Sequence, residues 1–108
     1  MSVSLQVLYP TTGGTTFDHA YYTAKHLPIV DELMAPHTEQ VIVVKGAGDP
    51  APFHAVATMI FADAAARDAA LAAAGPALDD IPNFYSGEPQ VLMGDVQAWI
   101  AGTGPRSQ

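Results

Sequence analysis

Residues 17–28 of this chain have the sequence FDHAYYTAKHLP, which brings aromatic, ionisable and helix-perturbing side chains together. Just before this stretch, Thr15 is followed three positions later by Asp18. This spacing is typical of a helix N-terminus, because a hydroxyl and a carboxylate can accept hydrogen bonds from the first free backbone N–H groups. We therefore expect a helix that begins near Thr16 and continues to Met34.

Pro28 should perturb this helix close to its midpoint. Proline has no N–H to donate and its ring crowds the preceding turn, so we expect a bend or break beside His26. Phe17 and Tyr21 fall on one apolar stripe at helical spacing, whereas Tyr22 and His26 lie one turn apart and can face the same space. The sequence thus predicts a phenol and an imidazole side by side at a helix irregularity.

The order Phe-Asp, Tyr-Tyr and His-x-Pro in this stretch closely resembles the first helix of the EthD family, small proteins named after the ethyl tert-butyl ether degradation system. Residues 81–96 also resemble the closing segment of the family, in which a short Asn-Phe stretch leads into the last strand. The resemblance implies a dimeric α+β barrel and an association with oxidative degradation. The wider superfamily includes isomerases, cyclases and oxygenases.

Hydrophobic periodicity places the remaining elements. Alternating or β-branched runs predict strands, an alanine-rich run predicts a second helix capped by Asp63, and Gly75-Pro76 should end that helix. The expected strands are Val3–Tyr9, Glu39–Gly46, His54–Phe61 and Pro89–Ile100, the second helix is Ala64–Ala74, and Pro76–Glu88 is expected to be irregular. The order βαββαβ predicts a ferredoxin-like α+β fold, a four-stranded antiparallel sheet with two helices on one face.

The chain length of 108 residues predicts a single domain, residues 1–101, followed by a flexible C-terminal tail, residues 102–108. Val41-Ile42-Val43-Val44 is apolar at every position, which predicts a strand buried from both sides. Two helices can cover only one face of the sheet, so we expect a second copy of the chain to cover the other. Composition and resemblance therefore both predict a homodimer joined through the sheet faces.

Charge and composition exclude several kinds of partner. The formal net charge is −7 with only four lysine and arginine residues, so the chain has little with which to bind a phosphate backbone and we expect no nucleic-acid partner. The sequence contains no cysteine, no signal-peptide pattern at its N-terminus and no apolar run of about 18 residues. We expect a cytoplasmic protein with no membrane association.

His26 is the strongest candidate for a catalytic residue, because imidazole can donate or accept a proton near neutral pH and Pro28 should open the helix toward a cleft there. Tyr22 could orient His26 or hydrogen-bond a carbonyl substrate. Each has a structural alternative, since a histidine at a helix irregularity can cap free carbonyls and a tyrosine one turn away can simply pack. Asp18 fits the role of a carboxylate that stabilises the helix start better than that of a catalytic acid.

Four further aromatic residues are candidates for lining a ligand pocket. Phe17 and Tyr21 come from the first helix, and Phe84 and Tyr85 can close one end of the pocket. Aromatic residues after a proline, as Phe84 and Tyr85 are after Pro82, are as often plain core.

The sequence predicts no cofactor and no metal ion. His19 precedes His26 by seven residues, about 10.5 Å along a helix axis, which is too far for one metal ion without other ligands. A haem site would rest on His26 alone as the axial ligand. Dinucleotide-binding and phosphate-loop glycine motifs are missing, and Ser86-Gly87 does not form a nucleophile elbow.

Two hypotheses of function follow. In the first, the chain is a cofactor-independent enzyme that binds an apolar metabolite with a carbonyl or enol group, such as a lactone or polyketide-like ring. His26 would move the proton and Tyr22 would hydrogen-bond the enolate-like oxygen during isomerisation, cyclisation or dehydration. In the second, the same pocket belongs to a non-catalytic binding or accessory protein. An oxidoreductase role follows only from the family association.

Overall fold

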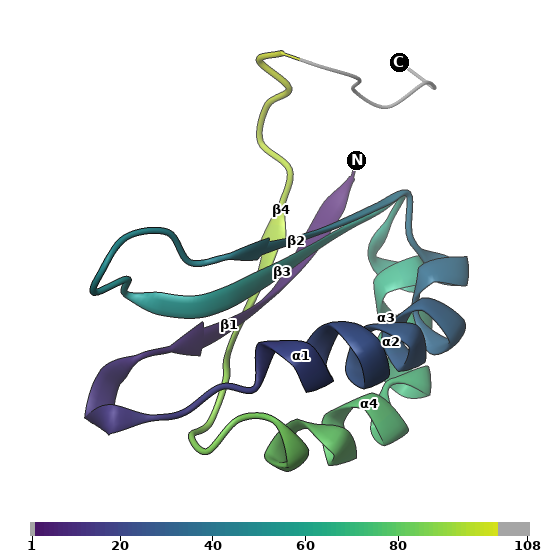
Figure 1. Ribbon diagram of the computed structural model, residues 1–108. Helices are drawn as coiled ribbons and strands as arrows, with labels where there is room; N and C mark the ends of the chain where they lie inside the picture. Colours follow the sequence, from purple (N-terminus) through teal and green to yellow (C-terminus); the bar gives the residue numbers. More distant parts are fainter. Residues whose placement is uncertain (1, 102–108) are drawn as a thin grey trace.

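A computed structural model describes residues 2–101 of the protein and shows a four-stranded antiparallel sheet with all the helices packed on one face (Figure 1). The strands are β1 (Val3–Pro10), β2 (Gln40–Lys45), β3 (Phe53–Phe61) and β4 (Gln90–Asp95). The helices are α1 (His19–Tyr21), a π-helical turn (Tyr22–His26), α2 (Leu27–Leu33), α3 (Ala64–Ala73) and α4 (Gly75–Asp80), with short 3₁₀ turns at Thr12–Gly14, Ala35–His37 and Ile81–Asn83. None of the helices within residues 2–101 has the length and hydrophobicity that crossing a bilayer requires.

The strand order is β2-β3-β1-β4, with every neighbouring pair antiparallel. β1 and β3 form the centre of the sheet, and β2 and β4 are its edges. Strand β2 joins β3 through a hairpin, whereas β1 connects to β2, and β3 to β4, through the helical segments. This is the ferredoxin-like βαββαβ plan that the sequence predicts.

Alternate side chains of the two central strands, β1 and β3, form the sheet side of the hydrophobic core. Leu5 and Tyr9 on β1 and Met59 and Phe61 on β3 point toward the helices and are buried. Because side chains on a strand alternate between its faces, the residues between them point to the opposite side of the sheet. The helices contribute mostly small residues from α3 and α4 to this core, such as Ala70, and can therefore lie close to the sheet.

The first helix begins two to three residues later than predicted. Asp18, not Thr15, is the N-cap: its carboxylate accepts a hydrogen bond from the backbone N–H of Tyr21 at 3.0 Å. The Thr15 hydroxyl instead donates to the carbonyl of Pro10 at 2.9 Å. Because that contact ties the segment before Asp18 to the end of β1, the helix starts only at His19.

The helix irregularity is confirmed, but it lies one turn before the proline. Residues Tyr22–His26 form a π-helical turn, and the backbone N–H of Leu27 bonds to the carbonyl of Tyr22, five residues earlier. Pro28 itself lies in the first turn of α2. A proline cannot donate a hydrogen bond to the residue four positions before it and crowds that carbonyl, so the wider turn takes up the strain without a break in the helix.

The second half of the chain contains more helix than predicted. The Asp63 carboxylate accepts from the N–H of Ala66 at 2.8 Å, which confirms the predicted cap of α3. The prediction that Gly75-Pro76 begins an irregular segment is wrong, because α4 starts at Gly75 with the proline in its first turn. Proline is well tolerated there, since its missing N–H has no partner at a helix start in any case.

The last strand is shorter than predicted. β4 ends at Asp95, opposite Val3, the first residue of β1. The N–H of Val96 still donates to the carbonyl of Ser2 at 2.9 Å, but within residues 2–101 the segment 96–100 forms no further β-ladder. The tail predicted at residues 102–108 lies outside the described residues.

The prediction that β2 is buried from both sides is wrong for the single chain. Val43 faces the helices, but Ile42 and Val44 lie on the opposite face and are 61% and 49% exposed. Leu92 on β4 shares that face and is 55% exposed. Nothing in residues 2–101 covers this apolar face of the sheet.

Candidate functional site

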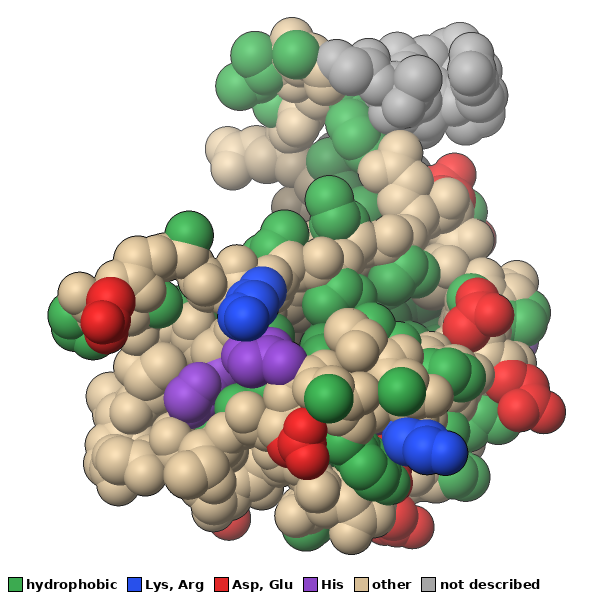
Figure 2. Space-filling view, viewed as in Figure 1, with side chains coloured by type: hydrophobic (Ala, Val, Ile, Leu, Met, Phe, Trp, Pro, Cys, Tyr) green, Lys and Arg blue, Asp and Glu red, His purple; other side chains and the backbone are tan. Residues whose placement is uncertain are grey.

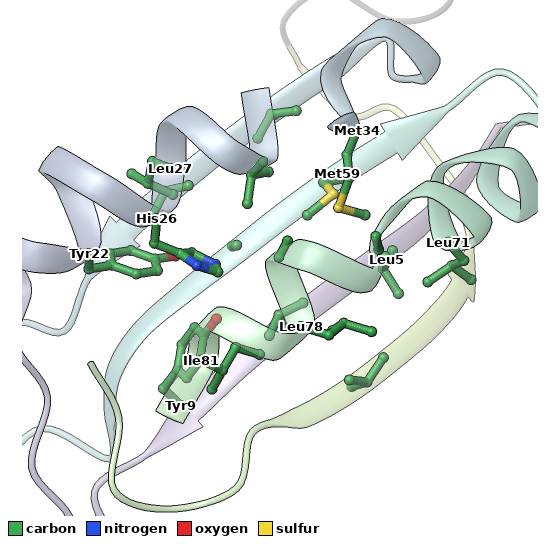
Figure 3. A pocket seen from close by; sticks show the side chains of 18 residues that line it. Leu5, Tyr9, Tyr22, His26, Leu27, Met34, Met59, Leu71, Leu78 and Ile81 are labelled. Atoms are coloured by element: carbon green, nitrogen blue, oxygen red, sulfur yellow. The ribbon is translucent and has the colours of Figure 1, made fainter. Parts of the chain in front are cut away.

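A cavity of about 60 Å³ lies between the helices and the sheet (Figure 3). Aliphatic side chains from all four strands and from α2, α3 and α4 form most of its wall. Only three of the side chains that line it carry a polar group at one end: Tyr9 from β1, and Tyr22 and His26 from the π-helical turn. The cavity is therefore an apolar space with one polar end.

His26 is the only ionisable side chain other than tyrosine in this wall, and it is 4% exposed. Its ring stacks on Tyr22, with ring centroids 5.4 Å apart, and packs against Phe84 at 4.5 Å. In Figure 3 the ring points from the helix toward the space between the helices and the sheet. Its Nδ1 lies 3.0 Å from Oδ2 of Asp80, the last residue of α4. Two aromatic rings and one hydrogen bond thus fix the position of the imidazole.

The Asp80 carboxylate is itself held by two further donors. The hydroxyl of Tyr21 donates to Oδ1 at 2.7 Å, and Nδ2 of Asn83 donates to the same oxygen at 2.9 Å. These donors come from α1 and from the 3₁₀ turn after α4. The carboxylate therefore connects the two helical layers at the polar end of the cavity.

The pKa shifts of His26 and Asp80 indicate which of the two side chains carries a proton. Burial lowers the pKa of His26 below its ordinary value, and the hydrogen bond and charge of Asp80 offset this only in part. Burial acts to raise the pKa of Asp80, but hydrogen bonds from Asn83, Tyr21 and His26 outweigh it and lower that pKa. Near neutral pH the pair is accordingly a neutral imidazole that donates from Nδ1 to a carboxylate, which leaves Nε2 as an acceptor. Within residues 2–101 no protein group hydrogen bonds to Nε2.

Two phenols share the polar end of the cavity with His26. Burial raises the pKa of Tyr22 to about 12, and burial, with smaller contributions from Tyr22 and Tyr85, raises the pKa of Tyr9 as well. Both hydroxyls therefore stay protonated and can donate a hydrogen bond. In the described part of the chain neither hydroxyl has a protein partner. Tyr9, Tyr22 and His26 together offer two donors and one acceptor.

The structure brings His26 and Tyr22 together as predicted from their spacing, but it places the four predicted pocket aromatics behind them. Phe17, Tyr21, Phe84 and Tyr85 are not part of the cavity wall. They form an aromatic cluster around Tyr9 that supports the polar end, with Phe17 and Phe84 each about 5 to 6 Å from its ring.

Within that cluster, the Tyr85 hydroxyl donates to the carbonyl of Pro10 at 2.7 Å. Phe17, Phe84 and Tyr85 also border a separate surface depression. A direct role of the four aromatic residues in ligand binding stays a prediction.

Asp80 and Tyr9 belong to the site but are not among the residues predicted from the sequence. Asp80 lies in the segment that was expected to be irregular, so no helical spacing linked it to His26. Tyr9 had a usable signal, because it shares the inward side of β1 with Leu5 in the alternating pattern. Residues 2–101 contain no group of three or more His, Asp or Glu side chains placed to hold a metal ion.

The fold and the cavity define a small α+β protein of the dimeric α+β barrel superfamily with one polar-ended apolar cavity. Residues 15–88 match the EthD domain, so the chain belongs to the EthD family. The matched segment includes α1, the π-helical turn, α4 and Asp80. Comparison with curated protein sequences gives no match.

Solved structures show the same fold. An EthD-like protein from Ralstonia eutropha is 31% identical, with 90% of this chain and 93% of that chain covered and a TM-score of 0.75. A variant of SnoaB, a cofactor-independent oxygenase from Streptomyces nogalater, is 12% identical over 94% of this chain and 98% of that chain, with a TM-score of 0.69. A dimeric protein of unknown function with a ferredoxin-like fold from Bacteroides fragilis is 7% identical over 87% and 95%, with a TM-score of 0.50.

Proposed function

We propose that this protein catalyses proton transfer on a small apolar molecule that carries a carbonyl or enol group. The observation that supports this most strongly is the His26–Asp80 pair, in which Nδ1 is held at 3.0 Å while Nε2 has no protein partner at the polar end of a cavity. A general base needs a fixed ring, an unprotonated nitrogen and an opposite charge for the imidazolium that forms. His26 and Asp80 supply all three.

The chemistry begins with a carbon next to the carbonyl of the ligand. Nε2 of His26 takes a proton from that carbon, the electrons of the broken C–H bond form a carbon–carbon double bond, and the negative charge moves to the carbonyl oxygen. The hydroxyl of Tyr22 or Tyr9 donates a hydrogen bond to that oxygen, which is effective because the cavity is apolar. The imidazolium then returns the proton to the same or another carbon. Isomerisation follows directly, and cyclisation or dehydration can start from the same enolate.

The size of the cavity sets a condition on the ligand. A volume of about 60 Å³ holds several water molecules but not a ring compound. Leu78 on α4 and Val91 on β4 line the cavity and are largely exposed, so they can move aside without loss of core packing. We propose that ligand binding widens the cavity at this edge.

The protein is further proposed to be a cytoplasmic homodimer joined through the uncovered sheet face. That face carries Ile42, Val44 and Leu92, each about half exposed or more in the single chain. Pairing two such faces is the simplest way to bury them, and a stable homodimer commonly buries more than about 2,000 Å². The lack of cysteine in the sequence fits a reducing compartment.

Hydrogen–deuterium exchange tests the proton-transfer proposal without knowledge of the natural substrate. Cyclohexanone is incubated with the protein in D₂O, and loss of its α-proton signal is followed by NMR. We expect exchange above the buffer rate with the wild-type protein and only the buffer rate with His26→Asn. Binding of cyclohexanone without any catalysed exchange would favour the alternative, a non-catalytic binding or accessory protein.

Light scattering tests the dimer. The wild-type protein should have twice the mass of one chain at micromolar concentration, and Ile42→Asp should be monomeric because it places a charge on the apolar face that the proposed interface buries. Ala65→Asp, on the exposed surface of α3, is the matched control and should remain dimeric. A monomeric wild-type protein would contradict the proposed assembly.

A further inference from the structure

A second hollow lies on the outside of the molecule, between the first helical segment and the end of β2, with a volume of about 400 Å³. Its wall includes His19 from α1 and Lys45 from β2. It shares three wall residues with the inner cavity, namely Tyr22, Leu27 and Val43. We call it the outer groove. These three side chains border both spaces, so the groove lies next to the cavity at this point.

The outer groove carries positive charge in a strongly acidic chain. Lys45 is one of only four strong bases, against 11 acidic residues, and no carboxylate in residues 2–101 forms an ion pair with it. Figure 2 shows a basic side chain (blue) beside histidine side chains (purple) on one face of the molecule. His54 on β3 also acts electrostatically on His19, and its Nε2 lies 3.1 Å from the Thr15 hydroxyl. The groove is thus a local site of attraction for an anion.

The pKa of His19 is consistent with positive charge in the outer groove. Burial of its ring lowers its pKa, the positive charges of Lys45 and His54 lower it further, and only Asp18 on its own helix acts in the opposite direction. Among the described residues its ring contacts Phe17, at 4.6 Å between centroids, but makes no hydrogen bond. Both nitrogens of His19 are therefore available to a ligand beside the charge of Lys45.

We propose that the outer groove is the entrance to the cavity and binds the carboxylate of an elongated apolar ligand through Lys45 and His19. The apolar body of this ligand passes Tyr22, Leu27 and Val43 toward His26. A monocarboxylate fits this pair, because one ammonium and one imidazole N–H can each satisfy one of its two oxygens. A phosphate would bring a further charge and a third oxygen, for which the groove offers no second lysine or arginine.

The helix sets the length of the ligand. His19 and His26 are seven residues apart, which would be about 10.5 Å along a regular α-helix and is somewhat less here because Tyr22–His26 form a wider π-helical turn. A carboxylate at the groove and a reactive carbon at His26 are therefore separated by roughly 10 Å, the length of a short chain plus a ring. The position of the reactive carbon rests on the proposed function of His26. The position of the carboxylate rests on the outer groove alone.

The test uses 4-phenylbutanoate and its neutral counterpart 4-phenylbutan-1-ol, titrated into the protein at low ionic strength with the His19 and His26 ring signals followed by NMR. We expect the carboxylate to bind about two to five times more tightly than the alcohol, within the usual range for one partly exposed charged contact. We also expect the pKa of His19 to rise on binding, because a nearby anion favours the imidazolium.

Two lysine variants make the test specific. Lys45→Gln should remove the preference for the carboxylate, and Lys25→Gln, which deletes an equal charge from the exposed side of the π-helical turn, should preserve it. Equal affinity for both probes, no saturable binding of 4-phenylbutanoate, or the same loss in both lysine variants would overturn the proposal.

His26→Asn separates this inference from the proposed function. The variant should still bind 4-phenylbutanoate with the same dependence on Lys45, although it no longer catalyses exchange. If exchange on cyclohexanone is absent in the wild-type protein but the dependence on Lys45 is found, only the proposed function fails. If exchange depends on His26 but the carboxylate preference is missing, only the entrance and ligand class proposed here fail.

Discussion

His19 and His26 belong to the same helical segment, seven residues apart, yet they lie in different environments. His26 is buried, stacked on Tyr22, packed against the tilted ring of Phe84, and bonded through Nδ1 to Asp80. His19 is partly exposed at the outer groove, close to Lys45, and its ring has no hydrogen bond among the described residues. The first is fixed by its neighbours and the second is free to adjust to a ligand.

Both histidines have lowered pKa values, with burial as the largest cause in each case. The direction of the shift therefore does not distinguish a base from a binding residue. The charged neighbours of each ring do distinguish the two roles. The carboxylate of Asp80 opposes the lowering of the pKa at His26, whereas positive charges reinforce the lowering at His19. A carboxylate on one ring nitrogen stabilises the imidazolium that proton transfer creates, and a lysine beside the ring favours an incoming anion instead.

The largest expected difference is in turnover. His26→Asn should lower the rate of catalysed exchange by about 10² to 10⁴, the usual contribution of a general base. The asparagine amide can occupy the position of Nδ1 and continue to donate to Asp80, so thermal stability should change little. His19→Asn should leave the exchange rate on neutral cyclohexanone within about twofold. Equal losses in both variants, measured by NMR in D₂O, would remove the distinction between the two histidines.

A smaller effect is expected for the partner of His26. Asp80→Asn should slow exchange by about 10- to 100-fold, because the ring loses the charge that stabilises its protonated form but keeps its position. Asp80 raises the pKa of His26, so its replacement should move the acidic limb of the pH–rate profile to lower pH. Asp79→Asn removes a neighbouring exposed carboxylate and should alter neither quantity. A rate loss without a shift of the acidic limb would indicate a purely structural role for Asp80.

The smallest effect is expected for the donor that holds the carboxylate. Tyr21→Phe removes the 2.7 Å hydrogen bond to Asp80 and preserves the ring. We expect the free energy of unfolding to fall only slightly, because the lost hydrogen bond is close to solvent, and exchange to slow by only a few-fold. Urea denaturation and the exchange assay measure the two quantities. A loss of activity as large as that of Asp80→Asn would mean that Tyr21, not Asp80, orients His26.

Local patterns were sufficient to predict several parts of this structure. Period-two alternation predicted β1, an apolar run predicted β3, and the four-residue spacing of Tyr22 and His26 predicted that both rings lie together. The missing N–H of Pro28 predicted an irregular helix, because this property belongs to the residue itself and does not depend on distant contacts.

The structural features that the sequence did not predict depend on contacts between segments that are distant along the chain. Asp80 reaches His26 across 54 positions, and no local spacing reveals that contact. Gly75-Pro76 follows the end of α3, as predicted, but the segment from Pro76 is not irregular throughout, because both residues fit the first turn of α4, which packs against α2 and α3. Thr15 was an acceptable N-cap by sequence alone, and it lost this role because its hydroxyl bonds to Pro10 at the end of β1.

The protonation of His26 tests most directly whether this residue is a base held by Asp80. Long-range ¹H–¹⁵N NMR of the histidine rings identifies which nitrogen carries the proton and how each ring titrates. We predict that at neutral pH His26 is neutral, with the proton on Nδ1 and Nε2 unprotonated, and that its pKa lies below the ordinary value for histidine. A proton on Nε2 at neutral pH, or a pKa at or above that ordinary value, would contradict the assignment of His26 as the base.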